Sequence, residues 1–333
     1  MSFEDLPVIP RPEKWRNLDG VVLLDKPIGL TSNQALQWMR RLFAASKGGH
    51  TGTLDPFATG VLPLCLGEAT KFSADLLNAD KTYLATVSFG QRTDTADLTG
   101  TVIESTDQLP TAEQLQRILE QFTGDSEQIP PMYSALKRDG QPLYKLARAG
   151  IEVERQPRKI HLQDLVWSAL ETNEAGRVLK ANLSVRCSKG TYIRTLAEDI
   201  AVAVGSLAHL VALRRTRVGD VSLEGCHTLE HLVAGVGKLA TAGAPSDETL
   251  IHAALLQPAD FLVKNLPQLI ISDQQAVLCR HGNAFKPEAG QNLEAGSTVR
   301  IYLDGRFIGV GQVDGIGKDQ KIQPVRLVSS SNS

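Results

Sequence analysis

Residues 49–71 constrain the fold most, because they join a polar, glycine-rich loop to an apolar strand. Gly52 and Gly60 allow positive φ angles or the close approach of a neighbouring backbone, and Pro56 keeps Asp55 out of a helical conformation. The loop therefore presents a single carboxylate directly ahead of a buried strand. The alternative at this point is an ordinary Asp-Pro turn without chemistry.

Apolar alternation and turn signals between Gly20 and Val218 predict an α+β fold in which strands separate the helices. Thr31 and Gln34 have the spacing of a capping box at the start of the first helix. The helices are expected at 31–44, 68–79, 111–122, 143–149 and 191–204.

The end of the chain predicts a second, smaller domain, with residues 1–262 forming the first domain and 263–333 the second. Short strands alternate with glycine turns from 263 to 330, which is the pattern of a small β-barrel. Residues 232–248 are rich in Ala, Gly, Ser and Pro. They indicate a linker or variable surface segment before a helix around 249–256, and the tail 329–333 is expected to be disordered.

Composition limits the function less than the motifs do. The 333 residues are 42% hydrophobic, enough for a substantial core and two domains. With 35 basic and 37 acidic residues the net charge is −2, so a nucleic-acid-binding surface would need clustered basic residues. The sequence offers two such clusters, at 137–159 and 186–217.

The cysteines and the amino terminus indicate a cytoplasmic protein. The four cysteines lie far apart without a CxxC pair, which predicts reduced thiols rather than a zinc ribbon or disulfide framework. The amino terminus lacks the pattern of a signal peptide, and no apolar stretch has the length of a membrane span. The four are Cys65, Cys187, Cys226 and Cys279.

Several segments resemble one known family. The run from His50 to Lys71 closely resembles the catalytic motif of the TruB family of tRNA pseudouridine synthases, whose Gly-x-Leu-Asp-Pro segment falls on residues 52–56. The resemblance continues in the strand and turn at 21–32, in the strand opening with Lys81-Thr82-Tyr83, and in the segments 186–196 and 210–217.

The resemblance implies a mixed, largely antiparallel catalytic sheet with flanking helices, followed by a PUA-like RNA-binding barrel. It implies an enzyme that isomerises the T-loop uridine of tRNA, position 55 in tRNA numbering, to pseudouridine without a metal or organic cofactor. The expected partner is tRNA, gripped at the T-arm by a mobile insert at about 128–152 and extending to the acceptor stem. The chain is expected to act as a monomer.

The resemblance also assigns roles to residues. Asp55 would be the nucleophile, Arg194 its partner and Tyr83 the residue that stacks on the uracil. A carboxylate must stay ionised in a pocket that a flipped base has emptied of water, and a guanidinium lowers its pKa and can hold it by two contacts. The further residues expected to bind substrate are Lys26, His50, which would fill the vacated place in the T-loop, Tyr192 and Leu213. The arginines at 214, 215 and 217 suit phosphate contacts.

Two other functions must be weighed. An RNA-binding protein or tRNA chaperone without activity would need no nucleophile, which favours the enzyme.

His227-Thr228-Leu229-Glu230-His231 fits the H-x-x-E-H pattern of a zinc metalloprotease. Residues 232–262 offer no obvious third ligand, and the family has a similar stretch that starts a helix capped near Thr228.

Overall fold

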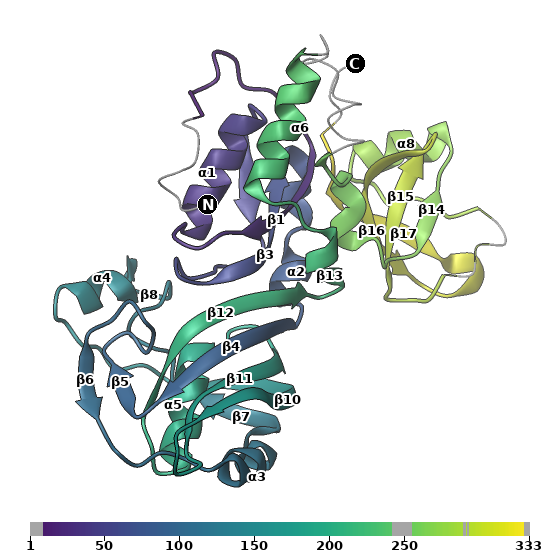
Figure 1. Cartoon of the computed structure of the whole chain (residues 1–333). Helices are drawn as coiled ribbons and strands as arrows, with labels where there is room; N and C mark the ends of the chain where they lie inside the picture. Colours follow the sequence, from purple (N-terminus) through teal and green to yellow (C-terminus); the bar gives the residue numbers. More distant parts are fainter. Residues whose placement is uncertain (1–8, 242–254, 289–290, 292, 330–333) are drawn as a thin grey trace.

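The structure is a computed structural model that describes residues 9–241, 255–288, 291 and 293–329 (Figure 1). A nine-stranded mixed sheet and its helices form the larger part of these residues, and a four-stranded sheet forms a smaller carboxy-terminal part. The predicted α+β class with a second, small domain is therefore confirmed.

The large sheet has the strand order β1-β3-β12-β4-β11-β10-β7, with β2 paired to β3 and β13 paired to β12. Neighbouring strands are antiparallel except β3 and β12, which pair in parallel over only two residue pairs. The strands are β1 (Gly20–Lys26), β2 (Gly48–His50), β3 (Thr59–Leu66), β4 (Lys81–Phe89), β7 (Gly124–Gln128), β10 (Arg158–Thr172), β11 (Val178–Cys187), β12 (Ala208–Val218) and β13 (Val221–Ser222).

Two hairpins lie outside this sheet, and four strands make the carboxy-terminal sheet in the order β14-β15-β16-β17. The hairpins pair β5 (Gln91–Thr93) with β6 (Val102–Ser105) and β8 (Lys137–Arg138) with β9 (Gln141–Pro142). The carboxy-terminal strands are β14 (Gln268–Ile270), β15 (Thr298–Leu303), β16 (Arg306–Asp314) and β17 (Lys321–Leu327).

Helices appear at all five predicted places, and Thr31 and Gln34 form the expected capping box. The predicted helix at 68–79 is instead two short elements. The hydroxyls of Thr70 and Ser73 bond to carbonyls three residues back, which competes with α-helical bonding. The helices are α1 (Ser32–Leu42), η2 (Gly67–Phe72), α2 (Ala74–Asn78), α3 (Ala112–Phe122), α4 (Leu143–Arg148), α5 (Ile193–Ala203), η3 (Leu223–Gly225), α6 (Leu229–Thr241), η4 (Ala259–Val263), α8 (Asp273–Arg280) and η5 (Gly317–Asp319).

The linker predicted from residue 232 is wrong as far as residue 241, because α6 occupies this stretch. Leu229 and Leu232 are buried in the main core, so tertiary packing outweighs the glycine content of the segment. The remainder of that segment, and most of the helix expected at 249–256, lie outside the described residues.

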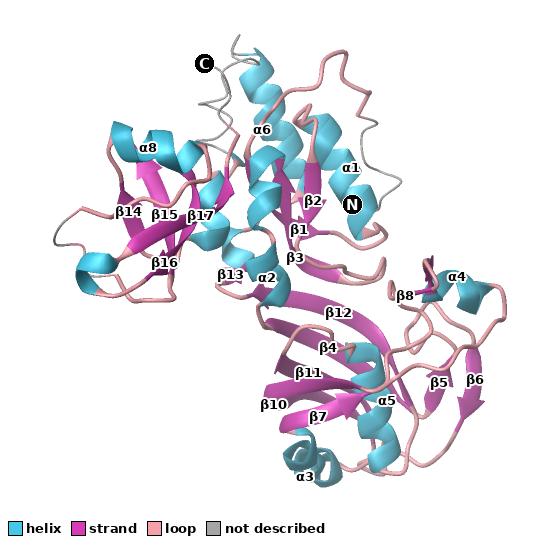
Figure 2. Cartoon of the chain, turned by 180° about the vertical axis from the view of Figure 1, so that it is seen from behind, coloured by secondary structure: helices cyan, strands magenta, loops and turns pink. Residues whose placement is uncertain are grey.

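The helices divide between two places on the large sheet (Figure 2). α3 and α5 lie on the part formed by β12, β4, β11, β10 and β7, where α5 contacts β12 and β4 and α3 contacts β10, whereas α1 and α6 flank β1 and β3. Leu196 and Ile200 of α5 are fully buried in the core. Across residues 9–241 and 255–329, no helix combines the length and the hydropathy that a bilayer crossing requires.

The carboxy-terminal sheet packs against the short helix η2. Phe72 and Phe307 meet edge to face with ring centroids 5.1 Å apart. Lys71 Nζ donates to the carbonyl of Leu327 at 2.8 Å. Because η2 directly follows β3, the strand after the Asp55 loop is connected to the second sheet.

Candidate active site

A cavity of about 430 Å³ lies between the Asp55 loop and the central strands. Its walls come from the loop 52–55, strands β4 and β12, the segment 188–194 and residues 134–136 of the expected insert. The pairing of β3 with β12 covers only two residue pairs, and the loop before β3 lines the cavity together with β4 and β12.

The backbone on both sides of Asp55 is fixed by buried polar groups. The Ser32 hydroxyl accepts a hydrogen bond from the Leu54 amide at 2.8 Å and donates to the Leu54 carbonyl at 3.2 Å. Beyond Asp55, the carbonyl of Pro56 accepts from the Gly29 amide at 2.8 Å. The loop therefore holds its carboxylate by the neighbours of Asp55, and leaves the side chain about a third exposed to the cavity.

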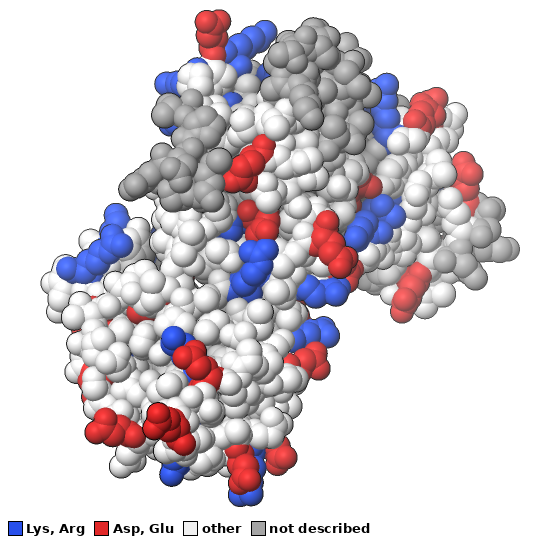
Figure 3. All heavy atoms as spheres, in the orientation of Figure 1, with Lys and Arg blue, Asp and Glu red and all other residues white. Residues whose placement is uncertain are grey.

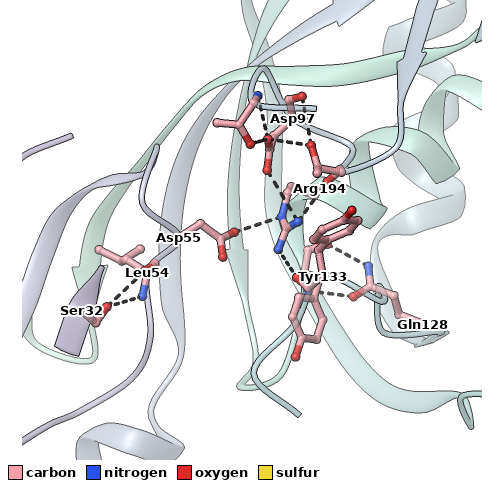
Figure 4. A network of polar contacts seen from close by, with 10 residues as sticks. Ser32, Leu54, Asp55, Asp97, Gln128, Tyr133 and Arg194 are labelled. Atoms are coloured by element: carbon pink, nitrogen blue, oxygen red, sulfur yellow. Dashed lines mark hydrogen bonds and ion pairs between the residues drawn. The ribbon is translucent and has the colours of Figure 1, made fainter. Parts of the chain in front are cut away.

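Arg194 is the residue that the Asp55 carboxylate contacts (Figure 4). Its Nε lies 3.0 Å from Oδ2 of Asp55, while Nη1 donates to the Thr95 carbonyl at 2.9 Å and Nη2 to the Tyr133 carbonyl at 2.7 Å. The predicted partnership is present, but the expected two-point contact is not, because both terminal nitrogens bond to backbone carbonyls. The Arg194 side chain is only 4% exposed, so these bonds fix its orientation.

A second carboxylate, which the sequence did not reveal, faces Arg194 from the other side. Oδ2 of Asp97 lies 3.6 Å from Nη1 of Arg194. Its Oδ1 accepts from the hydroxyl of Thr95 and from the amide and hydroxyl of Thr99. The signal in the sequence is the alternation of Thr95, Asp97 and Thr99, in which two hydroxyls flank one acid.

The groups around Asp55 have opposing effects on the pKa of its carboxyl. Burial raises the pKa of the Asp55 carboxyl, and Asp97 adds to the rise, whereas Arg194 and Lys26 lower it. Arg194 therefore offsets part of the cost of keeping the Asp55 carboxylate charged where burial disfavours that charge.

Gln128 fixes the start of the helix that carries Arg194. Its side-chain amide accepts from the Tyr192 amide at 2.8 Å and donates to the Tyr192 carbonyl at 3.1 Å (Figure 4). Gln128 is buried, and its two bonds hold the residue that precedes α5, whose own side chain makes no capping hydrogen bond. This contact joins positions 64 residues apart, and no local sequence pattern indicates it.

Three further predicted residues line the cavity: Tyr83, Tyr192 and Leu213. Tyr83 lies on β4 opposite Val185 and Arg215, so its ring borders the centre of the sheet. Burial raises the pKa of both tyrosine hydroxyls, which keeps them neutral. The cavity therefore combines aromatic and aliphatic walls, against which a flat, uncharged base would fit, with the Asp55 carboxylate and the basic side chains of Lys81, Lys189, Arg194 and Arg215.

The other two predicted substrate residues do not line this cavity. Lys26 is fully buried, and its Nζ donates to the carbonyls of Leu30, Pro27 and Pro56 at 2.8, 2.9 and 3.4 Å. Burial lowers the pKa of Lys26 to about 8. His50 is half-buried on β2, and burial together with Arg215 lowers the pKa of its imidazole.

The arginines of β12 do not form the row of phosphate contacts expected from the sequence. Arg214 pairs with Asp25 at 2.7 Å, and Arg215 is buried with its Nε bonded to the Val61 carbonyl at 2.8 Å. Of the three, Arg217 alone has an exposed side chain without such a partner within the described residues. On the face in Figure 3, basic side chains lie among acidic ones rather than in one field.

The H-x-x-E-H pattern does not form a metalloprotease site. His227 precedes α6 and pairs with Leu24 of β1, so the two histidines are not carried by one helix. Their rings stack with centroids 4.8 Å apart. Thr228 caps the helix by accepting from the His231 amide, as the alternative interpretation of this segment predicted.

Comparisons with known proteins agree with this geometry. Residues 40–193 match the model of the TruB family pseudouridylate synthase N-terminal domain. Residues 194–264 match the tRNA pseudouridylate synthase B C-terminal domain, and residues 267–328 match the model of pseudouridine synthase II TruB, C-terminal.

Relatives named tRNA pseudouridine synthase B, from Dechloromonas aromatica (strain RCB) and Stutzerimonas stutzeri (strain A1501), are each 49% identical over 317 residues. The first comparison covers 94% of this chain and the second 95%, and each covers 97% of the relative. The chain also resembles a protein in a solved Cbf5-Nop10-Gar1 complex, with a TM-score of 0.67 and 25% identity over 96% of this chain and 92% of that one.

Proposed function

The chain belongs to the TruB family of pseudouridine synthases, and from this premise we propose that it isomerises the T-loop uridine of tRNA, at position 55, to pseudouridine. The observation that carries the proposal is the placement of Asp55. A glycine loop holds this carboxylate at a cavity of base-compatible shape, within 3.0 Å of a buried guanidinium. A protein that only bound RNA would gain nothing from keeping a partly buried acid charged there.

The reaction requires a nucleophile and room for a base to turn. Asp55 attacks the flipped nucleotide, and the bond between uracil N1 and the ribose C1′ breaks. The uracil rotates within the cavity, C5 bonds to C1′, and the bond that Asp55 made to the nucleotide breaks, which frees the carboxylate. The proton lost from C5 is balanced by one gained at N1. Uracil is both leaving group and returning nucleophile, so the isomerisation consumes no co-reactant.

Arg194 is proposed to keep Asp55 charged and aimed during these steps. Asp97, Thr95 and Tyr133 hold the guanidinium from its far side, so it cannot rotate away when substrate enters. Preorganised charge of this kind costs no rearrangement at the moment of reaction.

The walls of the cavity are proposed to hold the extruded base. Flipping a nucleotide out of its stack costs a few kcal/mol, which stacking on an aromatic ring can offset. Tyr83 supplies that ring, while Tyr192 and Leu213 border the remaining edges. We assign Lys26 an indirect role, because it holds the carbonyl of Pro56, next to the nucleophile, rather than lining the cavity.

The remaining regions are proposed to contact tRNA outside the cavity. Residues 128–152 would grip the T-arm, with His50 filling the place that the flipped base leaves. Residues 263–333 would form the PUA-like domain that contacts the acceptor stem, and residues 1–262 the catalytic domain. The insert reaches the catalytic residues directly, since the Tyr133 carbonyl accepts from Arg194.

The test uses purified protein and an unmodified tRNA transcript labelled with tritium at C5 of uridine, with no metal or cofactor added. We expect release of one tritium per tRNA, and mapping of the pseudouridine to position 55. Modification at another position would contradict the proposed target, and no release would contradict the activity.

A further inference from the structure

We propose that a second, basic cavity beside the carboxy-terminal end of α1 binds backbone phosphates of the substrate RNA. The proposal rests on the tRNA substrate proposed above, and adds to it a contact site outside the catalytic cavity. This second cavity has a volume of about 460 Å³. It is lined by Arg11, Trp15, Gln37, Arg40, Arg41 and Ser46.

The charge of the second cavity differs from that of the chain. Among the described residues that line it, three are arginines and none is acidic, whereas the whole chain has a net charge of −2. On the face in Figure 3, basic and acidic side chains are interspersed, so a lining of one sign is a local feature. Phosphates are the groups that such a lining attracts.

Arg40 forms a fixed part of this cavity. Its Nη2 donates to the Ser46 carbonyl at 2.6 Å, Nη1 to the Gln37 side chain at 3.1 Å and Nε to the Ala45 carbonyl at 3.3 Å. Its guanidinium also lies over the Trp15 ring, 5.2 Å from the centroid. None of these partners is a carboxylate. Arg40 is therefore held in place without an acidic group that would neutralise its positive charge.

The other two arginines are available to a ligand. The side chains of Arg11 and Arg41 are exposed, and neither makes a hydrogen bond or an ion pair within the part of the chain that the structure describes. Arg186 and Arg214 differ, because they pair with Asp80 and Asp25 at 2.9 and 2.7 Å. An anion entering the second cavity would therefore meet two guanidinium groups that form no ion pair with a described residue. No existing ion pair would have to break before the anion binds.

The position of the cavity identifies RNA as the ligand. α1 begins at Ser32, which bonds to the residue before Asp55, and ends beside the second cavity. Eleven residues of helix span about 16 Å, a distance that an RNA engaged at Asp55 covers easily. An RNA already held in the catalytic cavity would reach the arginines at high effective concentration, unlike a free anion.

The experiment compares the wild-type protein with Arg11→Gln/Arg41→Gln, using unmodified full-length tRNA and a series of salt concentrations. We expect the dissociation constant to rise about tenfold at low salt, and the slope of log K against log salt to become shallower by about 1.5, as for two lost phosphate contacts. Turnover at saturating tRNA should stay unchanged, because neither arginine touches the catalytic cavity.

The matched control, Arg117→Gln/Lys180→Gln, removes the same charge from α3 and β11, at the far end of the molecule from α1 (Figure 1). It should bind tRNA like the wild type. Wild-type affinity in the first double variant, an unchanged salt slope, or an equal loss in the control would each overturn the proposal. Loss of the proposed function would appear separately, as a wild-type protein that binds tRNA but forms no pseudouridine.

Discussion

At the scale of single residues, the site depends on one guanidinium placed between two acids. Arg194 is nearly buried, and contacts Asp55 at 3.0 Å and Asp97 at 3.6 Å. Asp97 raises the pKa of Asp55, while Arg194 lowers it. The two neighbours should therefore move the ionisation of the nucleophile in opposite directions.

This opposition predicts the acid limb of the pH profile. Activity should fall as pH drops through the pKa of Asp55, because the protonated acid is no nucleophile. Asp97→Asn removes a negative charge that raises the pKa of Asp55, so the acid limb should shift to lower pH. Arg194→Gln removes the cation that lowers the pKa of Asp55, so the acid limb should shift to higher pH, with a large loss of rate. Turnover at saturating tRNA between pH 4 and 8 measures both shifts.

Asp107→Asn serves as the control, since Asp107 is exposed and has no part in the site. Its profile should overlay that of the wild type. Shifts of the same sign in the Asp97 and Arg194 variants would contradict the account of the electrostatics.

The sequence predicted the residues that lie in local motifs, and missed those that act through distant contacts. Asp55 and Arg194 were found because their segments resemble the motifs of a known family, whereas the residues alone also allowed an ordinary turn and a solvent-exposed arginine. Asp97 and Gln128 were not, because they bond to Arg194 and Tyr192 only once β7, the Thr95 turn and α5 are brought together. Burial of Lys26 likewise depends on the packing of β1 against the Asp55 loop.

At the scale of elements, the site depends on how closely β3 approaches β12. Gly60 has a φ of +106°, and a Cβ atom built there would lie 2.1 Å from the carbonyl oxygen of Arg215. A side chain at this position would separate the only parallel pair in the large sheet. The loop that holds Asp55 would move with the strand.

We therefore expect Gly60→Ala to lower the free energy of unfolding by about 3 kcal/mol or more, since strain at positive φ adds to a backbone clash. Gly176→Ala is the matched control, because Gly176 also has a positive φ of +71° but has nothing within 4 Å. It should cost only about 1 kcal/mol. Urea denaturation measures both, and equal costs would show that the close approach is not limiting.

The strand and helix pattern between residues 20 and 218 was predictable because many of its elements are amphipathic or locally capped. The split of the helix at 68–79 and the extension of α6 to residue 241 were not. At 68–79, side-chain hydroxyls compete with backbone amides for the carbonyls that an α-helix would use. In α6, the burial of leucines outweighs a composition typical of linkers.

At the scale of the whole molecule, the cavity and the second sheet are separate but connected. All residues that line the cavity lie between positions 52 and 215. Even so, Val310 of the carboxy-terminal sheet shares a buried cluster with Val21 and Val61 of the large sheet. The carboxy-terminal sheet is thus fixed against the strand that follows the Asp55 loop.

Phe307→Ala should weaken that connection. Loss of its edge-to-face contact with Phe72 and of its half-buried ring is expected to lower the free energy of unfolding by about 2 kcal/mol. Ile316→Ala, at a side chain that is 80% exposed in the same domain, should change it by less than about 0.5 kcal/mol. Chemical denaturation measures both values, and equal effects would contradict a packed interface.

The most direct test of the account is the activity of Asp55→Asn. The amide keeps the size of the side chain but lacks the nucleophilic charge, so the variant should form no pseudouridine above the uncatalysed background. Its affinity for unmodified tRNA should stay within about tenfold of the wild type, or about 1.4 kcal/mol. Tritium release from C5-labelled tRNA measures the activity, and product formation by this variant would contradict the assignment of Asp55 as the nucleophile.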